Sequence, residues 1–315
     1  MQIVIEIVAP VFGLIACGYI LARTPILTVN GARGLSAFVY YVAIPALLFR
    51  TMARGTAFGD VDFAIVYAYY AGATAVYALA MLIGRLVFRR SFAEMALMGL
   101  GGVFGNTVML GIPLIFTAFG EAGVVPITLI VAFHSITLIT AATILLEISR
   151  GHRGGIGRIV ISALSALLRN PVILSLLLGF AWGWTGLAMP IVLDRFIALL
   201  VGAAAPCALA ALGATLVSFR LGGNLWESVT VVGLKLLVLP LAVWLLAQWV
   251  FQLDPVWTAV ATIVAAMPVG VNVFMLAEQY ETYTARSASA VLISNGLAVV
   301  TLTVLLGLLA PAVGH

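Results

Sequence analysis

The chain has 315 residues, of which 64% are hydrophobic and only 8% are charged, and its mean hydropathy is +1.22. Soluble globular domains carry about 25% charged residues, so this chain has too little polar surface to cover itself in water. The net charge of +4 does not indicate nucleic-acid binding, because the fifteen basic residues lie in short gaps between apolar runs and form no basic patch. The composition therefore predicts an integral membrane protein.

Ten apolar segments follow one another along the chain, each near the length of about 20 residues that a transmembrane helix needs. They cover residues 3–22, 33–53, 63–84, 95–120, 122–146, 170–193, 196–219, 228–253, 255–277 and 287–315. No cleavable signal peptide is expected, because the N-terminus lacks a basic region and Glu6 lies early in the first segment. We predict an all-α membrane protein with ten transmembrane helices.

Arginines are distributed unequally between alternate loops, and this predicts the orientation. One set of loops carries eleven arginines, whereas the other set carries only Arg50, Arg54 and Arg195. Loops rich in basic residues stay in the cytoplasm, which places both termini outside the cytoplasmic membrane.

The ten segments divide into two halves of five. Residues 1–149 form a first five-helix repeat, residues 150–168 a basic cytoplasmic linker, and residues 169–315 a second repeat. Because the number of spans in each half is odd, the second half inserts upside down, as in transporters with inverted repeats. The prolines of the second and fourth spans lie 68 residues apart in one half and 62 apart in the other; they are Pro45, Pro113, Pro206 and Pro268.

The fourth and ninth segments are apolar but carry helix breakers and a lone asparagine. Proline cannot donate a backbone hydrogen bond, and the groups that it frees must be buried in protein or face a watery cavity. Two interrupted spans in corresponding places of two halves indicate the binding site of a secondary transporter. The residues concerned are Gly105, Asn106 and Pro113 in the fourth segment, and Pro268, Gly270 and Asn272 in the ninth.

Crossed broken helices would bring four half-helix ends together at mid-membrane. The N-terminal ends carry partial positive charge and unpaired N–H groups, which suit a carboxylate. The amides of Asn106 and Asn272 would add neutral donors and acceptors without the cost of a buried charge. Alternatively, these residues only pack against neighbouring helices or kink their own helix. That explanation suits one isolated residue better than two residues in equivalent spans.

The stretches GNTVMLGIPL (105–114) and MPVGVNVFMLAEQY (267–280) resemble the two signature segments of the auxin efflux carrier family. The resemblance implies a crossover fold like that of sodium/proton antiporters, with a substrate carboxylate held at the crossover by Asn106 and Asn272. The chain lacks the long central cytoplasmic loop of the plant PIN-FORMED auxin exporters. It is more similar to bacterial carriers of malate- or malonate-like acids, which implies a bacterial inner membrane.

Three further polar residues lie inside the predicted spans. Lys235 either faces the C-terminal ends of the half-helices in place of a sodium ion or extends to the cytoplasmic interface. His134 either couples transport to protons or forms an interior hydrogen bond. Asn295 either completes the site or bonds a neighbouring helix.

Rival functions fit the sequence less well. A cation- or proton-coupled exchanger or a sodium symporter of the same crossover fold remains the alternative, although none of the eleven acidic residues lies near the middle of a span. A membrane enzyme would need an aspartate pair, a metal motif or a Ser/His dyad, and no cofactor or metal is expected from the spacing of Cys17 and Cys207. The expected partners are a small carboxylate and the lipid bilayer, with no nucleic acid; a homodimer is left open.

Overall fold

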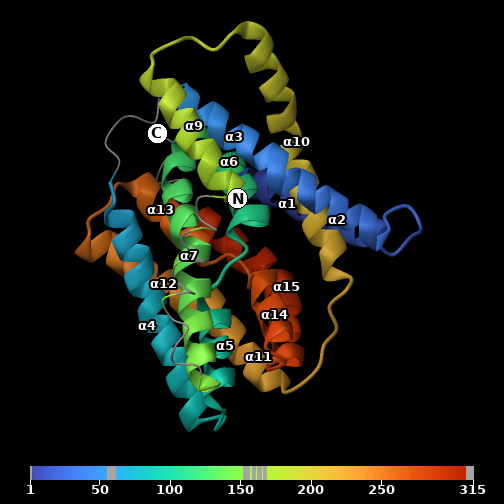
Figure 1. Ribbon diagram of the computed structural model, residues 1–315, viewed down its shortest axis with the longest axis vertical. Coiled ribbons are helices and arrows are strands. Elements are labelled where there is room, and N and C mark those ends of the chain that lie inside the picture. The colour runs from blue at the N-terminus through green and yellow to red at the C-terminus, as the bar shows by residue number, and fades with distance from the viewer. Residues whose placement is uncertain are drawn as a thin grey trace. The chain divides into compact units, whose positions relative to one another are not determined.

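The computed structural model describes residues 2–54, 62–151, 157, 161, 165 and 169–309, with only the backbone for residues 2–7. Within these residues the regular secondary structure is helical, apart from one isolated β-bridge (Figure 1). Most of the predicted linker 150–168 lies outside the described residues.

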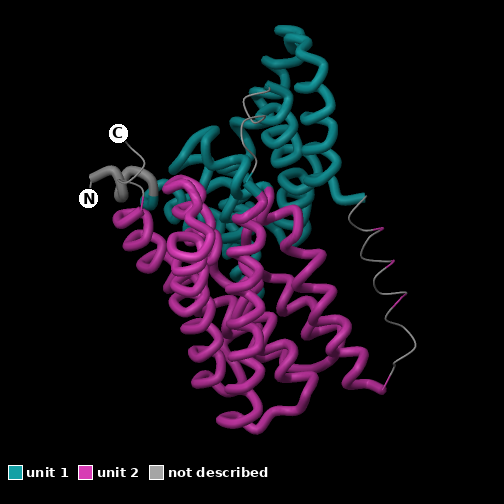
Figure 2. Tube along the Cα trace, turned by 90° about the vertical axis from the view of Figure 1, so that its left-hand side faces the viewer, with its two compact units in different colours: residues 1–62, 108–128, 166–218 teal, residues 63–107, 129–165, 219–315 magenta. Residues whose placement is uncertain are grey.

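The chain divides into two compact units, each built from segments of both sequence halves (Figure 2). Unit 1 comprises residues 1–62, 108–128 and 166–218, and unit 2 comprises residues 63–107, 129–165 and 219–315.

Unit 1 contains α1 (Gln2–Leu21), α2 (Val29–Phe38), η1 (Val39–Ala43), α3 (Ile44–Ala53), α6 (Ile112–Phe119), η4 (Gly120–Gly123), α9 (Pro171–Trp184) and α10 (Ile191–Leu216). Unit 2 contains α4 (Ala64–Leu86), α5 (Phe92–Val103), α11 (Leu225–Gly233), η6 (Leu234–Val238), α12 (Leu239–Leu245), η7 (Leu246–Val250), α13 (Pro255–Ala265), α14 (Val271–Gln279) and α15 (Thr284–Leu309). Two elements run from one unit into the other, η3 (Thr107–Gly111) and α7 (Val124–Ser149).

Six helices of the described residues are long and apolar enough to cross a membrane: Val29–Ala53, Ala64–Leu86, Thr107–Ser149, Ile191–Leu216, Leu225–Val250 and Thr284–Leu309. Four shorter apolar helices accompany them: Val8–Leu21, Phe92–Val103, Pro171–Trp184 and Pro255–Ala265. Two of the short helices belong to the segments for which the sequence predicts an interruption. The 43-residue helical stretch contains the rest of the fourth predicted segment and the whole of the fifth. The count of ten spans therefore stays a prediction.

Wide helical turns accompany three prolines inside the apolar segments. The π-helical turns η1, η3 and η6 each end two residues before a proline, and the prolines are Pro45, Pro113 and Pro240. A proline ring clashes with the carbonyl of the preceding turn and lacks an N–H, so a wider turn lets the helix continue instead of breaking. These prolines consequently begin the next helical stretch.

Glycines allow the helices of unit 1 to approach closely. An alanine Cβ at Gly18 of α1 would lie 2.0 Å from the Ala210 oxygen, and one at Gly213 of α10 would lie 1.9 Å from the Ile15 oxygen. Small residues of this kind are the usual means of packing helices in a membrane, where no hydrophobic effect drives helix association. The same unit pairs α3 with α9.

Unit 2 surrounds the two interrupted segments. Helix α5 packs against α4, where the Tyr77 hydroxyl donates to the Ala96 oxygen at 2.6 Å, and α13 packs against α12. Helix α15 lies beside both α11 and α14 (Figure 1). The interruptions are thus held from several sides within one unit.

Candidate functional site

Two interruptions of the helical backbone form the candidate site. Helix α5 ends at Val103 and helical structure resumes at Thr107; helix α13 ends at Ala265 and resumes at Val271. Both interruptions fall in the segments for which the sequence predicts them. All of the intervening residues belong to unit 2.

The two interruptions are joined through their backbones. Gly105 and Val269 form an antiparallel bridge. Two hydrogen bonds flank it, from Asn106 N to the Pro268 oxygen at 2.9 Å and from Gly270 N to the Phe104 oxygen at 3.0 Å. The polar groups that each break exposes are therefore satisfied in part by the other break, as an apolar environment requires.

Gly270 is a position where a larger residue cannot fit. A Cβ there would lie 2.7 Å from the Phe104 ring and 3.1 Å from the Gly105 oxygen. Gly270 precedes the first residue of α14, and no side chain caps the N-terminus of that helix. The N–H groups of the first turn of α14 thus have no side-chain cap and suit an anion.

The two asparagines lie on either side of the joined breaks. The Asn106 backbone takes part in the pairing and the residue is partly exposed. Asn272 lies in the first turn of α14 and is exposed. Both amides belong to backbone stretches that the bridge holds together.

Lys235 is fully buried in the π-helical turn η6. Its Nζ donates a hydrogen bond to the Ala265 oxygen at the C-terminal end of α13. The same amine lies 3.2 Å from the position that a Cβ on Gly105 would take. The lysine therefore lies next to both interruptions, at an end of α13 where the helix dipole is negative.

His134 and Asn295 lie in the same unit but make different contacts. His134 on α7 is buried, and its Nε2 accepts a hydrogen bond from Gly105 N at 3.1 Å. Asn295 on α15 donates from Nδ2 to the Val291 oxygen of its own helix at 2.8 Å. His134 therefore contacts the interrupted backbone directly, whereas the amide of Asn295 bonds within its helix.

Pro113 lies apart from the break in the fourth segment. It is in the first turn of α6, whereas the helix is interrupted at residues 104–106. It also belongs to unit 1, whereas the other candidate residues belong to unit 2.

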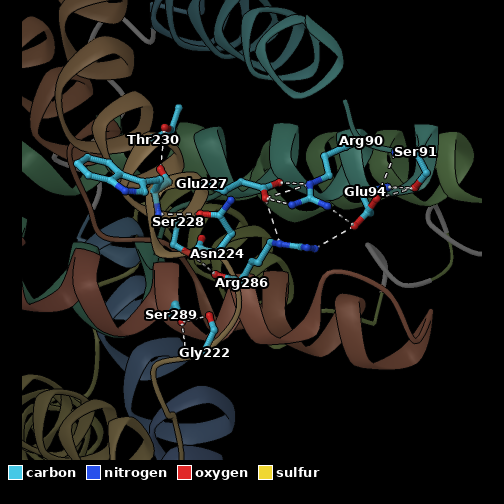
Figure 3. Close-up of polar contacts among 11 residues, drawn as sticks. Arg90, Ser91, Glu94, Gly222, Asn224, Glu227, Ser228, Thr230, Arg286 and Ser289 are labelled. Atoms are coloured by element: carbon cyan, nitrogen blue, oxygen red, sulfur yellow. Dashed lines mark hydrogen bonds and ion pairs between the residues drawn. The ribbon is translucent and has the colours of Figure 1, made fainter. Parts of the chain in front are cut away.

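Sequence reasoning missed a buried ion cluster in unit 2 (Figure 3). The Glu227 carboxylate is 0% exposed and contacts Arg90 Nη2 at 2.8 Å and Arg286 Nε at 3.0 Å. Arg286 Nη1 also contacts Glu94 Oε1 at 2.9 Å. These four residues, here called the arginine–glutamate cluster, join the connection between α4 and α5 to the first turns of α5, α11 and α15. No local pattern reveals it, since its pairs are up to 192 residues apart.

Tyr283 lies beside the cluster in the turn between α14 and α15. Its backbone φ is 62°, an uncommon conformation for a bulky residue, and its ring lies 5.4 Å from the Arg286 guanidinium carbon. Burial, together with the neighbouring negative charge of Glu227, raises the pKa of Tyr283 well above its usual value. Within the described part of the chain, no group of three or more His, Cys, Asp or Glu residues could hold a metal ion.

The structure contains several apolar helices that are long enough to cross a membrane, and two shorter ones, α5 and α13, end at the polar backbone junction. These features define a membrane protein with several membrane-crossing helices. Residues 3–306 match the family described as Membrane transport protein, and the chain belongs to this family. This confirms the resemblance to the auxin efflux carriers.

The chain is similar to two known proteins. A protein of Rhizobium meliloti (strain 1021) named "Putative malonate transporter" is 32% identical over 304 residues, which cover 96% of this chain and 95% of that protein. The lysosomal cholesterol signaling protein of Mus musculus is 28% identical over 245 residues, which cover 73% of this chain but only 28% of that protein. The protein is thus a membrane transporter and not an enzyme.

Proposed function

We propose that this protein is a secondary transporter that moves a small carboxylate across the bacterial inner membrane by alternating access. The observation that carries the proposal is the backbone junction of the two interruptions, with Asn106 and Asn272 beside it and Lys235 buried next to it. Broken helices that meet inside an apolar protein are the usual construction of a transporter binding site.

The substrate carboxylate binds to a helix N-terminus and to side-chain amides, and not to an arginine. The N-terminal turn of α14 offers N–H groups and partial positive charge, and no side chain caps it. The Asn106 and Asn272 amides donate to the carboxylate from the two sides of the junction. Pro268 keeps the chain from closing into a continuous helix, so these N–H groups stay available.

Lys235 supplies a positive charge at this site. Its position at the C-terminal end of α13 is one where a transporter that depends on sodium would place the cation. Full burial and the hydrogen bond to Ala265 support this role over an extension of the side chain to the membrane surface. A sodium-coupled symporter would instead need a second cation at the same helix end.

We further propose ten spans in two inverted repeats, covering residues 1–149 and 169–315. The helix pairs of unit 1 support this proposal. Helix α1 of the first segment packs on α10 of the seventh, and α3 of the second segment packs on α9 of the sixth. In an inverted repeat, segment 1 corresponds to segment 6 and segment 2 corresponds to segment 7. The pair of segments 1 and 7 therefore corresponds to the pair of segments 6 and 2.

The substrate class follows from the site and from the relative. The R. meliloti protein is named for malonate, a dicarboxylate of three carbons, and it aligns along nearly the whole chain. We propose a malonate- or malate-like acid, since a site of amides and helix ends recognises a carboxylate group without demanding an aromatic ring.

Uptake of radiolabelled malonate into proteoliposomes tests the proposal, with pH, sodium and voltage gradients imposed in turn. Asn106→Ala and Asn272→Ala each remove one donor to the carboxylate, which costs about 1–3 kcal/mol, or roughly ten- to hundredfold in affinity. Replacement by aspartate weakens binding further, because the new charge repels the substrate.

Gln248→Ala is the matched control, since it removes an exposed amide in the middle of η7 in the same unit. If both aspartate variants bind malonate as tightly as the wild type, the substrate site lies elsewhere. Uptake that depends strictly on sodium would favour the symporter.

Cysteine labelling tests the orientation. In a background without Cys17 and Cys207, a cysteine at Gln279 should resist an impermeant thiol reagent in intact cells, and one at Leu187 should react. Labelling of position 279 from outside would contradict the proposed topology.

A further inference from the structure

The two residues of the bridge have a feature in common beyond their pairing. Gly105 N donates to Nε2 of His134 at 3.1 Å, and Val269 N donates to Oγ of Ser294 at 3.0 Å. Each acceptor comes from the long helix that follows the whole interrupted segment, α7 for Gly105 and α15 for Val269. A histidine and a serine thus each accept a hydrogen bond from the bridge residue of one interruption.

These two bonds complete the hydrogen bonding of the junction. The bridge has four central N–H groups, and the flanking backbone bonds satisfy only two of them. The other two point away from the bridge and would be unsatisfied in an apolar interior, where a free N–H is costly. His134 and Ser294 accept from these two groups.

The geometry also fixes the proton on His134. A ring nitrogen that accepts an N–H bond carries no hydrogen, so Nε2 is the unprotonated nitrogen of a neutral imidazole. Protonation of Nε2 would set two donors against each other at Gly105 and break the bond.

The surroundings of His134 favour the neutral form as well. The Lys235 amine also lies close to Gly105, 3.2 Å from the position that a Cβ there would take, and would repel a second positive charge. The Tyr69 ring of α4 lies edge-on at 5.9 Å and the Phe104 ring at 4.6 Å, while the Tyr70 hydroxyl donates to the Ile130 oxygen. No carboxylate contact of His134 is present among the described residues.

We infer that His134 and Ser294 are positioning residues that hold the paired breaks in their extended form, and that His134 does so as a neutral acceptor and not as a proton carrier. The inference rests on the proposed function, because the held backbone presents Asn106 and the N-terminus of α14 to the substrate. Ser294 can accept a hydrogen bond from Val269 N because its hydroxyl hydrogen is donated to the Val291 oxygen of its own helix, which leaves its lone pairs free to accept.

Three substitutions at His134 separate positioning from proton transfer. Glutamine places an amide oxygen near the location of Nε2 and can still accept from Gly105, whereas asparagine reaches only the location of Nδ1, and leucine accepts nothing. Malonate uptake should fall about ten- to hundredfold in His134→Leu and His134→Asn, while His134→Gln stays within about threefold of the wild type. Ser294→Ala should fall like His134→Leu.

The pH profile of uptake gives the decisive comparison. A neutral positioning residue predicts that His134→Gln keeps the wild-type profile, since glutamine does not titrate. A flattened profile in His134→Gln would overturn the inference, and so would wild-type uptake by His134→Leu.

Amide hydrogen exchange gives a readout that needs no transport. In purified protein in detergent, the peptide that contains residues 104–107 should exchange about ten- to hundredfold faster in His134→Leu, but not in His134→Gln. Unchanged exchange in His134→Leu would refute the positioning role. Should the wild type carry no acid while this exchange pattern holds, the proposed function fails and the positioning role stands.

Discussion

Substitution of Glu227 by glutamine removes the negative charge that Arg90 and Arg286 share. The carboxylate is 0% exposed, and the two arginine side chains are 22% and 21% exposed. Without that charge, Glu94 alone faces two guanidinium groups at the ends of four helices. Breaking a buried ion pair by removing one partner costs about 3–5 kcal/mol. Because solvent reaches both arginines, we expect the lower end of this range, about 3 kcal/mol.

The measurement is the temperature at which the purified protein loses its monodisperse form in detergent, compared at one heating rate. A loss of about 3 kcal/mol lowers the unfolding temperature of a unit of 150–250 residues by about 6–12 °C. Glu278→Gln is the matched control, because Glu278 is exposed at the end of α14 and its loss should leave the temperature unchanged.

A double substitution distinguishes buried charge from lost packing. Glu227→Leu leaves Arg90 with only its longer contact to Glu94, at 3.8 Å, whereas Glu227→Leu with Arg90→Leu removes one charge of each sign. We expect the double variant to be more stable than the sum of the two single effects predicts, by about 1–3 kcal/mol. Strict additivity, or a Glu227→Gln protein that melts like the wild type, would refute the claim that the arginine–glutamate cluster stabilises unit 2.

Three further predictions concern single residues. Gly270→Ala should reduce uptake at least tenfold, because the new Cβ forces the junction apart; this is the order of effect of losing one hydrogen bond to the charged substrate. Gly296→Ala, whose Cβ would meet open space, should leave uptake unchanged. Lys235→Ala should likewise abolish uptake while expression stays normal, and full uptake would argue against a charge at the site. The raised pKa of Tyr283 contributes stability that is complete below its unfolded value near pH 10 and is lost as the pH rises further, so thermal stability should fall less in alkali for Tyr283→Phe.

The sequence predicted the interruptions because local chemistry decides them. A proline and glycines within an otherwise apolar segment weaken the helix, and this places one break at 266–270, around Pro268. The other break was located less well. Pro113 marks the start of α6 after a π-helical turn, and the interruption lies before it, at Gly105. A wider turn absorbs a proline at small cost, and sequence alone does not distinguish that outcome from a break.

The supporting contacts could not be predicted, because they depend on which helices become neighbours. The hydrogen bond from Gly105 to His134 spans 29 residues and the ion pair of Arg90 with Glu227 spans 137. His134 was recognised as a polar residue inside an apolar segment, but its partner was not. Glu227 lies at the start of a helix, where an acidic residue is ordinary and gives no sign of burial.

The junction of the two interruptions would explain how this apolar protein could keep the proposed polar binding site open. Every break in a helix frees N–H groups that hydrocarbon cannot satisfy. Here Asn106 and Gly270 donate across the bridge, while Gly105 and Val269 donate to side chains of α7 and α15. The backbone of the breaks therefore needs no ligand in order to be stable. In the proposed mechanism, the first turn of α14, which no side chain caps, would bind the substrate, and the site could be empty during the return step without collapsing.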